Sequence, residues 1–368
     1  MYIEVETPPL IFHRPSRAVK MTFSLDFNTL NDKPKPDLPY VKGYEFSVRE
    51  FFPPEPQNKP TFTLSPDEGF QRQNIDVLTR CFARKPLSGR LGSRTLRLKI
   101  NEPIRVGDEN RSQIVLVDAV SGQAPATTMV AKLYDPLYYD HSNDDVDPFL
   151  FVDIEFTRET AAYTHLHSHG ETHVPEYYGS YTMDISHSNR QFRTVRLILF
   201  QYIAGNSMAA LQPHGFRQVL REAILEQIIN VESRLYESNL WHRDTSPRNI
   251  IIRGLGSNVH VTIIDFGHAS IGRSRDPKND NLESEFLPGI YINPILRWYK
   301  SRGREPVSSF EEWINWEWNS WLFNNYHSDI EKINPEVIER WLPPSVREEV
   351  LAIVLMEKRG QERVTLID

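Results

Sequence analysis

The alternation of apolar and polar residues predicts a series of strands from about residue 95 onward. In residues 96–100 leucine and isoleucine alternate with charged residues, and residues 104–106 continue the pattern. Residues 113–120 and 127–133 are two further apolar segments, separated by turns that contain Gly107 and Gly122. A period of two is typical of strands. We therefore expect an antiparallel meander in this part of the chain.

Helical periodicity predicts two long helices after the meander. The first covers about residues 151–167, and the second covers residues 216–238. In the second, apolar residues form one stripe (Leu220, Ile224, Ile228, Val231 and Leu235). Residues 195–202 lie between the helices and read as an apolar strand that ends before Gly205. The pattern favours an α+β protein.

Proline interrupts the first part of the chain at residues 8–9, 34, 36, 53–54, 56 and 60. Because proline has a fixed φ and no N–H, such stretches act as extended connectors. We expect residues 1–94 to be an N-terminal extension of unknown role. Proline-rich pieces of this kind are either arms that lie on a neighbouring domain or ligands for partner modules.

The composition excludes several classes of function. The net charge of −7 gives no general attraction to nucleic acid or to an anionic membrane. Cys81 is the single cysteine, which excludes an intramolecular disulfide and fits a reducing compartment. The N-terminus lacks the basic and apolar regions of a secretory signal, and no apolar run is long enough to span a membrane. We expect a cytoplasmic or nuclear protein without nucleic-acid or membrane partners.

Three polar residues after the second helix carry the candidate chemistry. Asp244 and Asn249 lie five residues apart, and Asp265 follows a short apolar hairpin in the run Asp265-Phe266-Gly267. Asp244 can accept the proton of an attacking hydroxyl. Asn249 and Asp265 offer hard oxygen ligands that suit the magnesium ions bound to nucleotide phosphates. This pattern favours a phosphotransferase.

Residues 240–249 and 263–267 resemble the catalytic loop and the metal-binding motif of the protein-kinase superfamily, and in detail the fungal atypical kinase-like proteins. The resemblance implies a bilobal α+β fold with two parts. Residues 95–203 would form an N-lobe with a small antiparallel sheet and one helix. Residues 204–368 would form a reduced, mainly helical C-lobe.

The same resemblance assigns the phosphate clamp. Lys132 ends a strand in Val-Ala-Lys, where the phosphate-binding lysine of kinases lies. Its expected partner is Glu159 on the helix of residues 151–167, and Glu155, one turn earlier, is the competitor. We expect Mg-ATP to be the cosubstrate.

The resemblance also assigns residues around the adenine. Ala131 and Ile251 would lie above and below the base, and the backbone of Gln201 and Ile203 would bind its edge. Phe200 would stand behind it. The turn at residues 106–112 would cover the phosphates, but it has one glycine and two carboxylates. Acidic groups beside a polyphosphate weaken binding unless a cation such as Arg111 compensates.

The C-terminal region departs from the kinase pattern because it has no Ala-Pro-Glu motif. Residues 265–307 read as a reduced activation segment. Ser309 and Glu312 form a possible capping box, which predicts a helix rich in tryptophan from residue 309. A last helix is expected over residues 345–357.

These residues predict transfer of the ATP γ-phosphoryl group to a hydroxyl, with Ser or Thr of a protein as the favoured acceptor. Two alternatives remain: a small-molecule kinase, and a pseudokinase that acts as a binding module. The histidines at positions 165, 167, 169 and 173 suggest either a metal site or favourable contacts at a helix C-terminus. Cys81 is expected to be a small core residue.

Overall fold

The computed structural model of the chain describes residues 34–56, 66–122, 127–141, 147–187, 191–254, 256–271, 289, 291–300, 306–333, 335, 338–339, 342 and 344–365. Pro8, Pro9, Pro60, the acidic residues 142–146 and much of the expected activation segment lie outside these ranges. The described residues form a mixed α+β structure.

Antiparallel strands form a closed barrel in the order β1-β2-β3-β4-β6-β5. The strands are β1 (Glu45–Phe52), β2 (Arg90–Arg105), β3 (Gln113–Ser121), β4 (Met129–Tyr134), β5 (Tyr177–Ser186) and β6 (Phe192–Gln201). Residue pairs Arg49↔Thr182 and Glu50↔Tyr181 join β1 to β5 and close the barrel. The expected meander corresponds to β2, β3 and β4, and its antiparallel pairing is confirmed.

Alternation along the strands separates two hydrophobic cores. In β4, Met129, Ala131 and Leu133 point into the barrel. Val130 and Tyr134 belong to a larger core that continues through helix α3 (Pro148–Ser168) into the helical part of the molecule. Asp147 caps α3 by accepting hydrogen bonds from the amides of residues 149 and 150, and Pro148 occupies its first turn.

The barrel begins earlier in the chain than the sequence pattern predicts. Strand β1 and the first residues of β2 lie within residues 1–94, which we expected to be an extension. The helices α1 (Pro66–Asn74) and α2 (Val77–Ala83) also lie there. Strand β5 was not expected, because its sequence Tyr-Tyr-Gly-Ser-Tyr-Thr-Met-Asp-Ile-Ser has no clear alternation.

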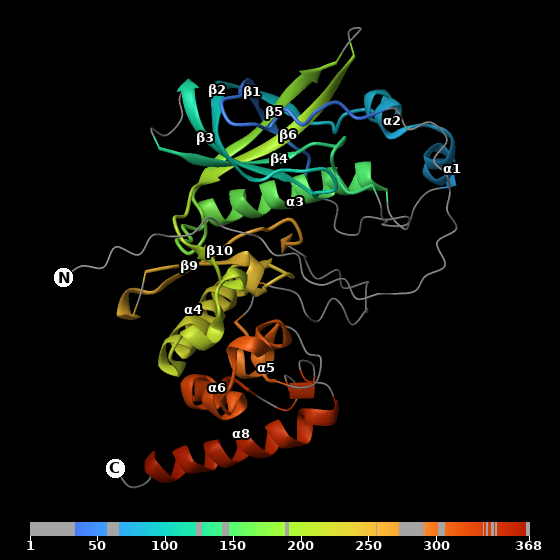
Figure 1. Cartoon of the computed structure of the whole chain (residues 1–368). Helices are drawn as coiled ribbons and strands as arrows, with labels where there is room; N and C mark the ends of the chain where they lie inside the picture. The colour runs from blue at the N-terminus through green and yellow to red at the C-terminus, as the bar shows by residue number, and fades with distance from the viewer. Residues whose placement is uncertain are drawn as a thin grey trace, which may run out of the picture.

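Helices occupy the opposite side of α3 from the barrel (Figure 1). They are α4 (Gln218–Glu237), α5 (Pro294–Trp298), α6 (Trp318–Tyr326) and α8 (Pro344–Thr365). Short strands lie between α4 and the barrel: β9 (Ile250–Arg253) pairs with β10 (His260–Ile263) and β7 (Asn206–Ser207), and β8 (Leu240–Trp241) pairs with β11 (Ser270–Ile271).

The expected tryptophan-rich helix from Ser309 is wrong. Residues Val307–Trp313 form a 3₁₀ helix with Pro306 at its start and without a side-chain cap, so the Ser309–Glu312 capping box does not form. Ile314 is extended, and α6 begins four residues later. Arg221 of α4 donates a hydrogen bond of 2.9 Å to the carbonyl oxygen of Trp313. This tertiary contact takes a carbonyl group that a continuous helix would use itself.

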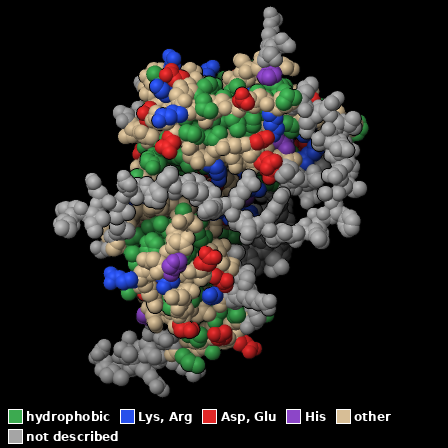
Figure 2. Space-filling model, viewed as in Figure 1, with side chains coloured by type: hydrophobic (Ala, Val, Ile, Leu, Met, Phe, Trp, Pro, Cys, Tyr) green, Lys and Arg blue, Asp and Glu red, His purple; other side chains and the backbone are tan. Residues whose placement is uncertain are grey.

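Basic and acidic side chains are mixed over the face that Figure 2 shows, so the described residues there form no large patch of one charge. Among the described helices, none combines the length and apolar character that crossing a bilayer requires.

Candidate functional site

A buried ion-pair network joins the barrel to the segment after β10. The Nζ atom of Lys132 in β4 lies 2.6 Å from Oε2 of Glu159 in α3 and 2.7 Å from Oδ1 of Asp265. The hydroxyl of Tyr134 also donates to Oε2 of Glu159. The structure therefore brings together three of the residues that the sequence singled out, although 133 positions separate Lys132 from Asp265.

The electrostatics of this network keep its central groups charged. Burial alone would lower the pKa of Lys132, but the carboxylates of Asp265 and Glu159 outweigh it and raise that pKa. Burial would raise the pKa of Asp265, and the adjacent Lys132 ammonium overcomes this and holds it well below its usual value. Burial raises the pKa of Glu159. At neutral pH the site presents an ammonium and the Asp265 carboxylate side by side.

The backbone at Asp265 is left-handed, with φ of 66°. This conformation is uncommon for a residue with a side chain and is found where the surroundings enforce it. Here Phe266 is fully buried between the rings of Tyr163 and His242, at centroid distances of 5.2 and 4.8 Å. The packing of Phe266 thus holds Asp265 toward Lys132.

Asn249 links the loop of residues 242–249 to the segment that carries Asp265. Its Nδ2 donates to the backbone oxygen of Asp244 at 2.9 Å and to Oδ2 of Asp244 at 3.0 Å. Its own backbone oxygen accepts from the amide of Ile264 at 2.9 Å. Asn249 is 3% exposed, so these contacts fix Asp244, Asn249 and Asp265 in one neighbourhood.

The Asp244 carboxylate is paired with an exposed arginine. Nη2 of Arg248 lies 2.6 Å from Oδ1 and 2.9 Å from Oδ2 of Asp244. The Arg248 side chain is 69% exposed, against 21% for Asp244. Because an exposed side chain can leave its partner at low cost, Arg248 can shield Asp244 in the free protein and also reach a bound anion.

The donor set suits a magnesium ion. The side-chain amide nitrogen of Asn249 donates to Asp244, so its side-chain carbonyl oxygen is left as a ligand. Oδ1 of Asp265 accepts from Lys132, so Oδ2 is left as a ligand, and the lowered pKa of Asp265 keeps the carboxylate ionised. Hard oxygen donors with one or two carboxylates are what magnesium prefers beside a phosphate.

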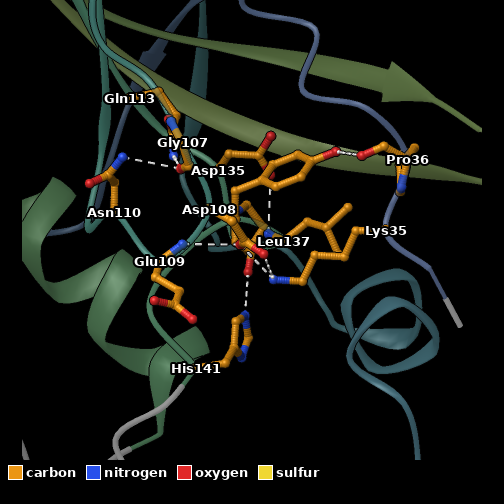
Figure 3. A network of polar contacts seen from close by, with 12 residues as sticks. Lys35, Pro36, Gly107, Asp108, Glu109, Asn110, Gln113, Asp135, Leu137 and His141 are labelled. Carbon is orange, nitrogen blue, oxygen red and sulfur yellow. Dashed lines mark hydrogen bonds and ion pairs between the residues drawn. The ribbon is translucent and has the colours of Figure 1, made fainter. Parts of the chain in front are cut away.

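The loop between β2 and β3, residues 106–112, is held by side chains rather than by glycines (Figure 3). The side chain of Gln113 accepts from the amide of Gly107 at 2.8 Å and donates to its carbonyl oxygen at 2.9 Å. Asn110 donates to the same oxygen at 3.2 Å. Lys35 binds both carboxylate oxygens of Asp108, at 2.6 and 2.8 Å, and so neutralises one of the two acidic residues of the loop.

Arg111 connects this loop to α3 and to the segment after Asp265. Its guanidinium lies 3.1 Å from Oε1 of Glu155 and 2.9 Å from Nε2 of His268. Glu155 therefore pairs with Arg111, while Glu159 holds Lys132. Burial raises the pKa of Glu155 to about 7, although Arg111 and Lys132 lower it.

One of the expected nucleotide residues points the wrong way. Ala131 lies inside the barrel, because side chains alternate along β4 and Ala131 is adjacent to Lys132. Val130, two residues before Lys132, shares the face of the lysine and belongs to the core that contains α3. Counting by two from Lys132 would have identified Val130 from the sequence. The same count reaches Tyr134, which the sequence analysis also missed.

The other expected nucleotide residues lie around the connection from β6 to β7. Gln201 ends β6, where it pairs with Met129 of β4, and its amide donates to the oxygen of Glu176 at 2.9 Å. Ile203 follows it and is half-buried. Ile251 of β9 approaches Gly205 so closely that a Cβ there would come within 2.7 Å of it. Phe200 stacks on Tyr163 at 5.5 Å.

The histidines near the end of α3 make structural contacts. The ring of His165 hydrogen-bonds through Nε2 to the backbone oxygen of Ser238 after α4, and its centroid lies 4.1 Å from that of His169. Within the described ranges, no group of three or more His, Cys, Asp or Glu side chains is arranged to hold a metal ion. Cys81 is buried beside Leu78, Leu137 and Tyr138, as expected of a core residue.

Comparison with known proteins gives a limited likeness to a kinase. No family model matches the sequence. The chain is similar to the serine/threonine-protein kinase STN8, chloroplastic, of Arabidopsis thaliana, with 29% identity over 119 residues. The match covers 31% of this chain and 23% of that protein, so the chain spans less than a quarter of the relative's length. The similarity supports a kinase-like phosphotransferase.

Proposed function

We propose that this chain is a Mg-ATP-dependent phosphotransferase with the bilobal arrangement of the protein-kinase superfamily. The observation that carries the proposal is the contact of Lys132 with both Glu159 and Asp265. A lysine held by a helix carboxylate beside a metal-binding aspartate is the arrangement that clamps nucleotide phosphates in kinases. The barrel with α3 would be the N-lobe, and the part from α4 onward would be the C-lobe.

Each residue has a role that follows from its chemistry. Lys132 would neutralise the α- and β-phosphate oxygens, with Glu159 holding its flexible stem. Asn249 and Asp265 would hold magnesium, which supplies charge neutralisation between the phosphates. Val130 and Ile251 would enclose the adenine, and the backbone of Gln201 and Ile203 would bind its edge.

Asp244 would orient the acceptor hydroxyl and accept its proton. The hydroxyl oxygen forms a bond to the γ-phosphorus while the bond from that phosphorus to the β–γ bridging oxygen breaks, and ADP leaves with the electron pair. Before this step Arg248 must release the Asp244 carboxylate. A negatively charged γ-phosphate near the loop is a stronger partner for the guanidinium and would draw it away.

The acceptor favoured by this proposal is Ser or Thr of a protein. The relative's name is that of a serine/threonine-protein kinase, and Arg243 precedes Asp244 as it does in protein kinases. The resemblance to the fungal atypical kinase-like proteins belongs to the same proposal. A small-molecule acceptor remains the second candidate, because the Ala-Pro-Glu motif of peptide-binding kinases is missing.

A pseudokinase is favoured by one observation. Arg248 binds both carboxylate oxygens of Asp244, the proposed base. A protein that only binds its partners does not need a free Asp244 carboxylate. Thermal-shift titration with Mg-ATP separates the candidates. A nucleotide-binding protein gains about 2.7 kcal/mol of stability at a ligand concentration of 100 times Kd, and Asp265→Asn should abolish that gain. No stabilisation of the wild type at millimolar Mg-ATP would reject ATP binding.

Transfer itself is tested with γ-labelled ATP and a cell extract separated into protein and small-molecule fractions. Asp244→Asn serves as the blank, since it removes the base and keeps the size of the side chain. Label in protein that depends on Asp244 supports the protein-kinase assignment. Label found only in the small-molecule fraction would show that the acceptor is a small molecule and not a protein. Label that does not depend on Asp244 would reject the mechanism.

A further inference from the structure

A cavity of about 290 Å³ lies beside α3, outside the proposed nucleotide site. Its walls come from α2 and the residues after it, from the start of β6, from the end of β4 and from Asp153 of α3. This volume is just below the usual range for small-molecule pockets, about 300–1,000 Å³. The cavity is partly open to solvent, and the phosphoryl-transfer roles proposed above use none of its lining residues.

The lining is basic. Arg84, Arg193 and Arg196 all contribute to the walls. Arg84 forms an ion pair with Asp153, and Arg193 forms one with Asp135 at 3.0 Å. Among the described residues, no carboxylate lies within ion-pair distance of Arg196. Arg196 is therefore the lining arginine without a directly bonded carboxylate, and the charges of Asp153 and Asp184 act on it from a greater distance.

Arg196 is also incompletely hydrogen-bonded. It is 7% exposed, and its Nη atoms donate to the Thr182 hydroxyl and to the Leu87 backbone oxygen, the latter at 2.8 Å. Its Nε is buried without a partner. Burial lowers the pKa of Arg196 to about 10. The guanidinium also stacks on the Phe51 ring at 3.9 Å. Since a buried charge without a directly bonded counter-ion is costly, an anion beside Arg196 would stabilise this site.

Much of the remaining lining is apolar, and Asp153, Gln191 and Thr194 add polar side chains to it. Phe82, Leu87 and Phe192 contribute side chains, and Phe192 is 54% exposed at the edge of the cavity. A few convergent polar groups in an apolar wall are typical of small-molecule sites. We propose that this cavity binds a small ligand with an oxyanion head, carboxylate or phosphate, on an apolar body, with Arg196 as the anion-binding residue.

The position of the cavity connects it to the proposed catalytic network. Tyr134 lines the cavity, and its hydroxyl donates to Glu159, the partner of Lys132. A ligand in the cavity would contact the tyrosine that holds Glu159. The ligand site itself does not depend on the phosphotransferase assignment.

Direct binding tests the proposal. We expect phenyl phosphate or benzoate to bind the wild-type chain with a Kd of about 0.1–1 mM by calorimetry, and the two probes distinguish a phosphate head from a carboxylate head. Benzyl alcohol, the neutral control, should bind at least about 10-fold more weakly because it leaves the guanidinium charge unpaired. A Kd above 10 mM for both anions, or equal binding of the alcohol, would overturn the proposal.

Variants locate the binding. Arg196→Met keeps an unbranched side chain of similar length and removes the guanidinium, which stacks on the Phe51 ring, so it should weaken binding at least about 10-fold. Arg97→Met is the matched control, because Arg97 lies on β2, pairs with Glu45 and is outside the cavity. If Arg196→Met does not fold, Phe192→Ala at the exposed edge should weaken binding instead. Unchanged affinity in the variant that folds would contradict the site.

Asp265→Asn should bind phenyl phosphate as the wild type does. That result separates the cavity from the nucleotide site, so the failure of one proposal leaves the other standing.

Discussion

Glu155 is a buried carboxyl group whose titration falls near neutral pH. It lies on α3 one turn before Glu159, and Arg111 reaches it from the β2–β3 loop. Burial raises the pKa of Glu155 from 4.5 to about 7. The native state therefore holds this proton more tightly than the unfolded chain does.

The consequence is a loss of stability as the pH rises. The contribution of Glu155 is fully present below about pH 4.5 and is lost as the pH rises to about 7. At about 1.4 kcal/mol per pKa unit, the loss is at most about 3 kcal/mol. Glu155→Gln should remove this slope in urea unfolding measured from pH 4.5 to 8. Equal slopes for the variant and the wild type would contradict the assignment.

Arg248 is the second residue whose environment predicts an effect. It neutralises Asp244 in the free protein and is largely exposed. If it moves to the γ-phosphate during transfer, Arg248→Met should lower kcat by about 10- to 100-fold, the scale of one charge-stabilising group. Stability should change by less than about 1 kcal/mol, because the ion pair is exposed.

Arg248→Lys is the control for this prediction. It keeps the charge but not the two-pronged geometry of the guanidinium, so it should recover part of the rate. If Arg248→Met transfers phosphate at the wild-type rate, Arg248 only pairs with Asp244 and has no role in transfer. An increased rate would show that the pairing is inhibitory.

At the scale of elements, the described N-terminal segment holds the β2–β3 loop. Besides the Lys35–Asp108 ion pair, the Tyr138 hydroxyl donates to the backbone oxygen of Pro36 at 2.5 Å. Tyr40 donates to Asp135 at 2.5 Å, and Asp135 is also bound by Arg193. The segment is therefore attached to the residues that follow β4 by contacts just after Lys35, and Lys35 places a cation on an acidic loop (Figure 3).

This attachment predicts an effect on nucleotide affinity. Lys35→Met leaves Asp108 uncompensated, and its charge should weaken Mg-ATP binding by about 3- to 10-fold through repulsion of the phosphates. Asp108→Asn in the Lys35→Met background should restore the affinity. Calorimetric titration of the wild type, both single variants and the double variant forms a complete cycle. Additive effects would show that the two residues act independently.

At the scale of the molecule, α3 lies between two packed regions. Its buried residues belong to the core that extends from Val130 and Tyr134 of β4 to the helices around Trp298 and Trp318. Lys132 adds a polar connection between the barrel and Asp265. A change that moves Tyr134 can thus reach Glu159, Lys132 and Asp265 through direct contacts.

This chain of contacts predicts coupling between the cavity and the proposed nucleotide site. A ligand in the cavity restrains Tyr134, so less ordering remains when nucleotide binds beside Lys132. Saturating phenyl phosphate should tighten Mg-ATP binding by about 2- to 10-fold, and Mg-ATP should tighten phenyl phosphate binding by the same factor. Tyr134→Phe, which removes the hydrogen bond to Glu159, should reduce the coupling. If the affinity for each ligand is the same with and without the other, the two sites are not coupled.

The local periodicity of the sequence determined much of the architecture. Strands β2 to β4, the strand β6 and the helices α3, α4 and α8 lie close to the expected ranges, because alternation and helical stripes record which side of an element is buried. The spacing of Asp244, Asn249 and Asp265 selected the neighbourhood that the structure assembles. Ala131 was misplaced although its alternation with Lys132 was readable in the sequence.

Only the tertiary structure decided the features that depend on contacts between distant segments. Strand β1 closes the barrel by pairing with both β2 and β5, and Lys35 meets a carboxylate 73 positions away. The helix expected from Ser309 is replaced by a 3₁₀ helix over Val307–Trp313, and the carbonyl group of Trp313 accepts from Arg221, 92 positions earlier. Local periodicity shows that a face is buried but not which partner covers it. The partner is selected by packing and by the pairing of buried polar groups over the whole chain.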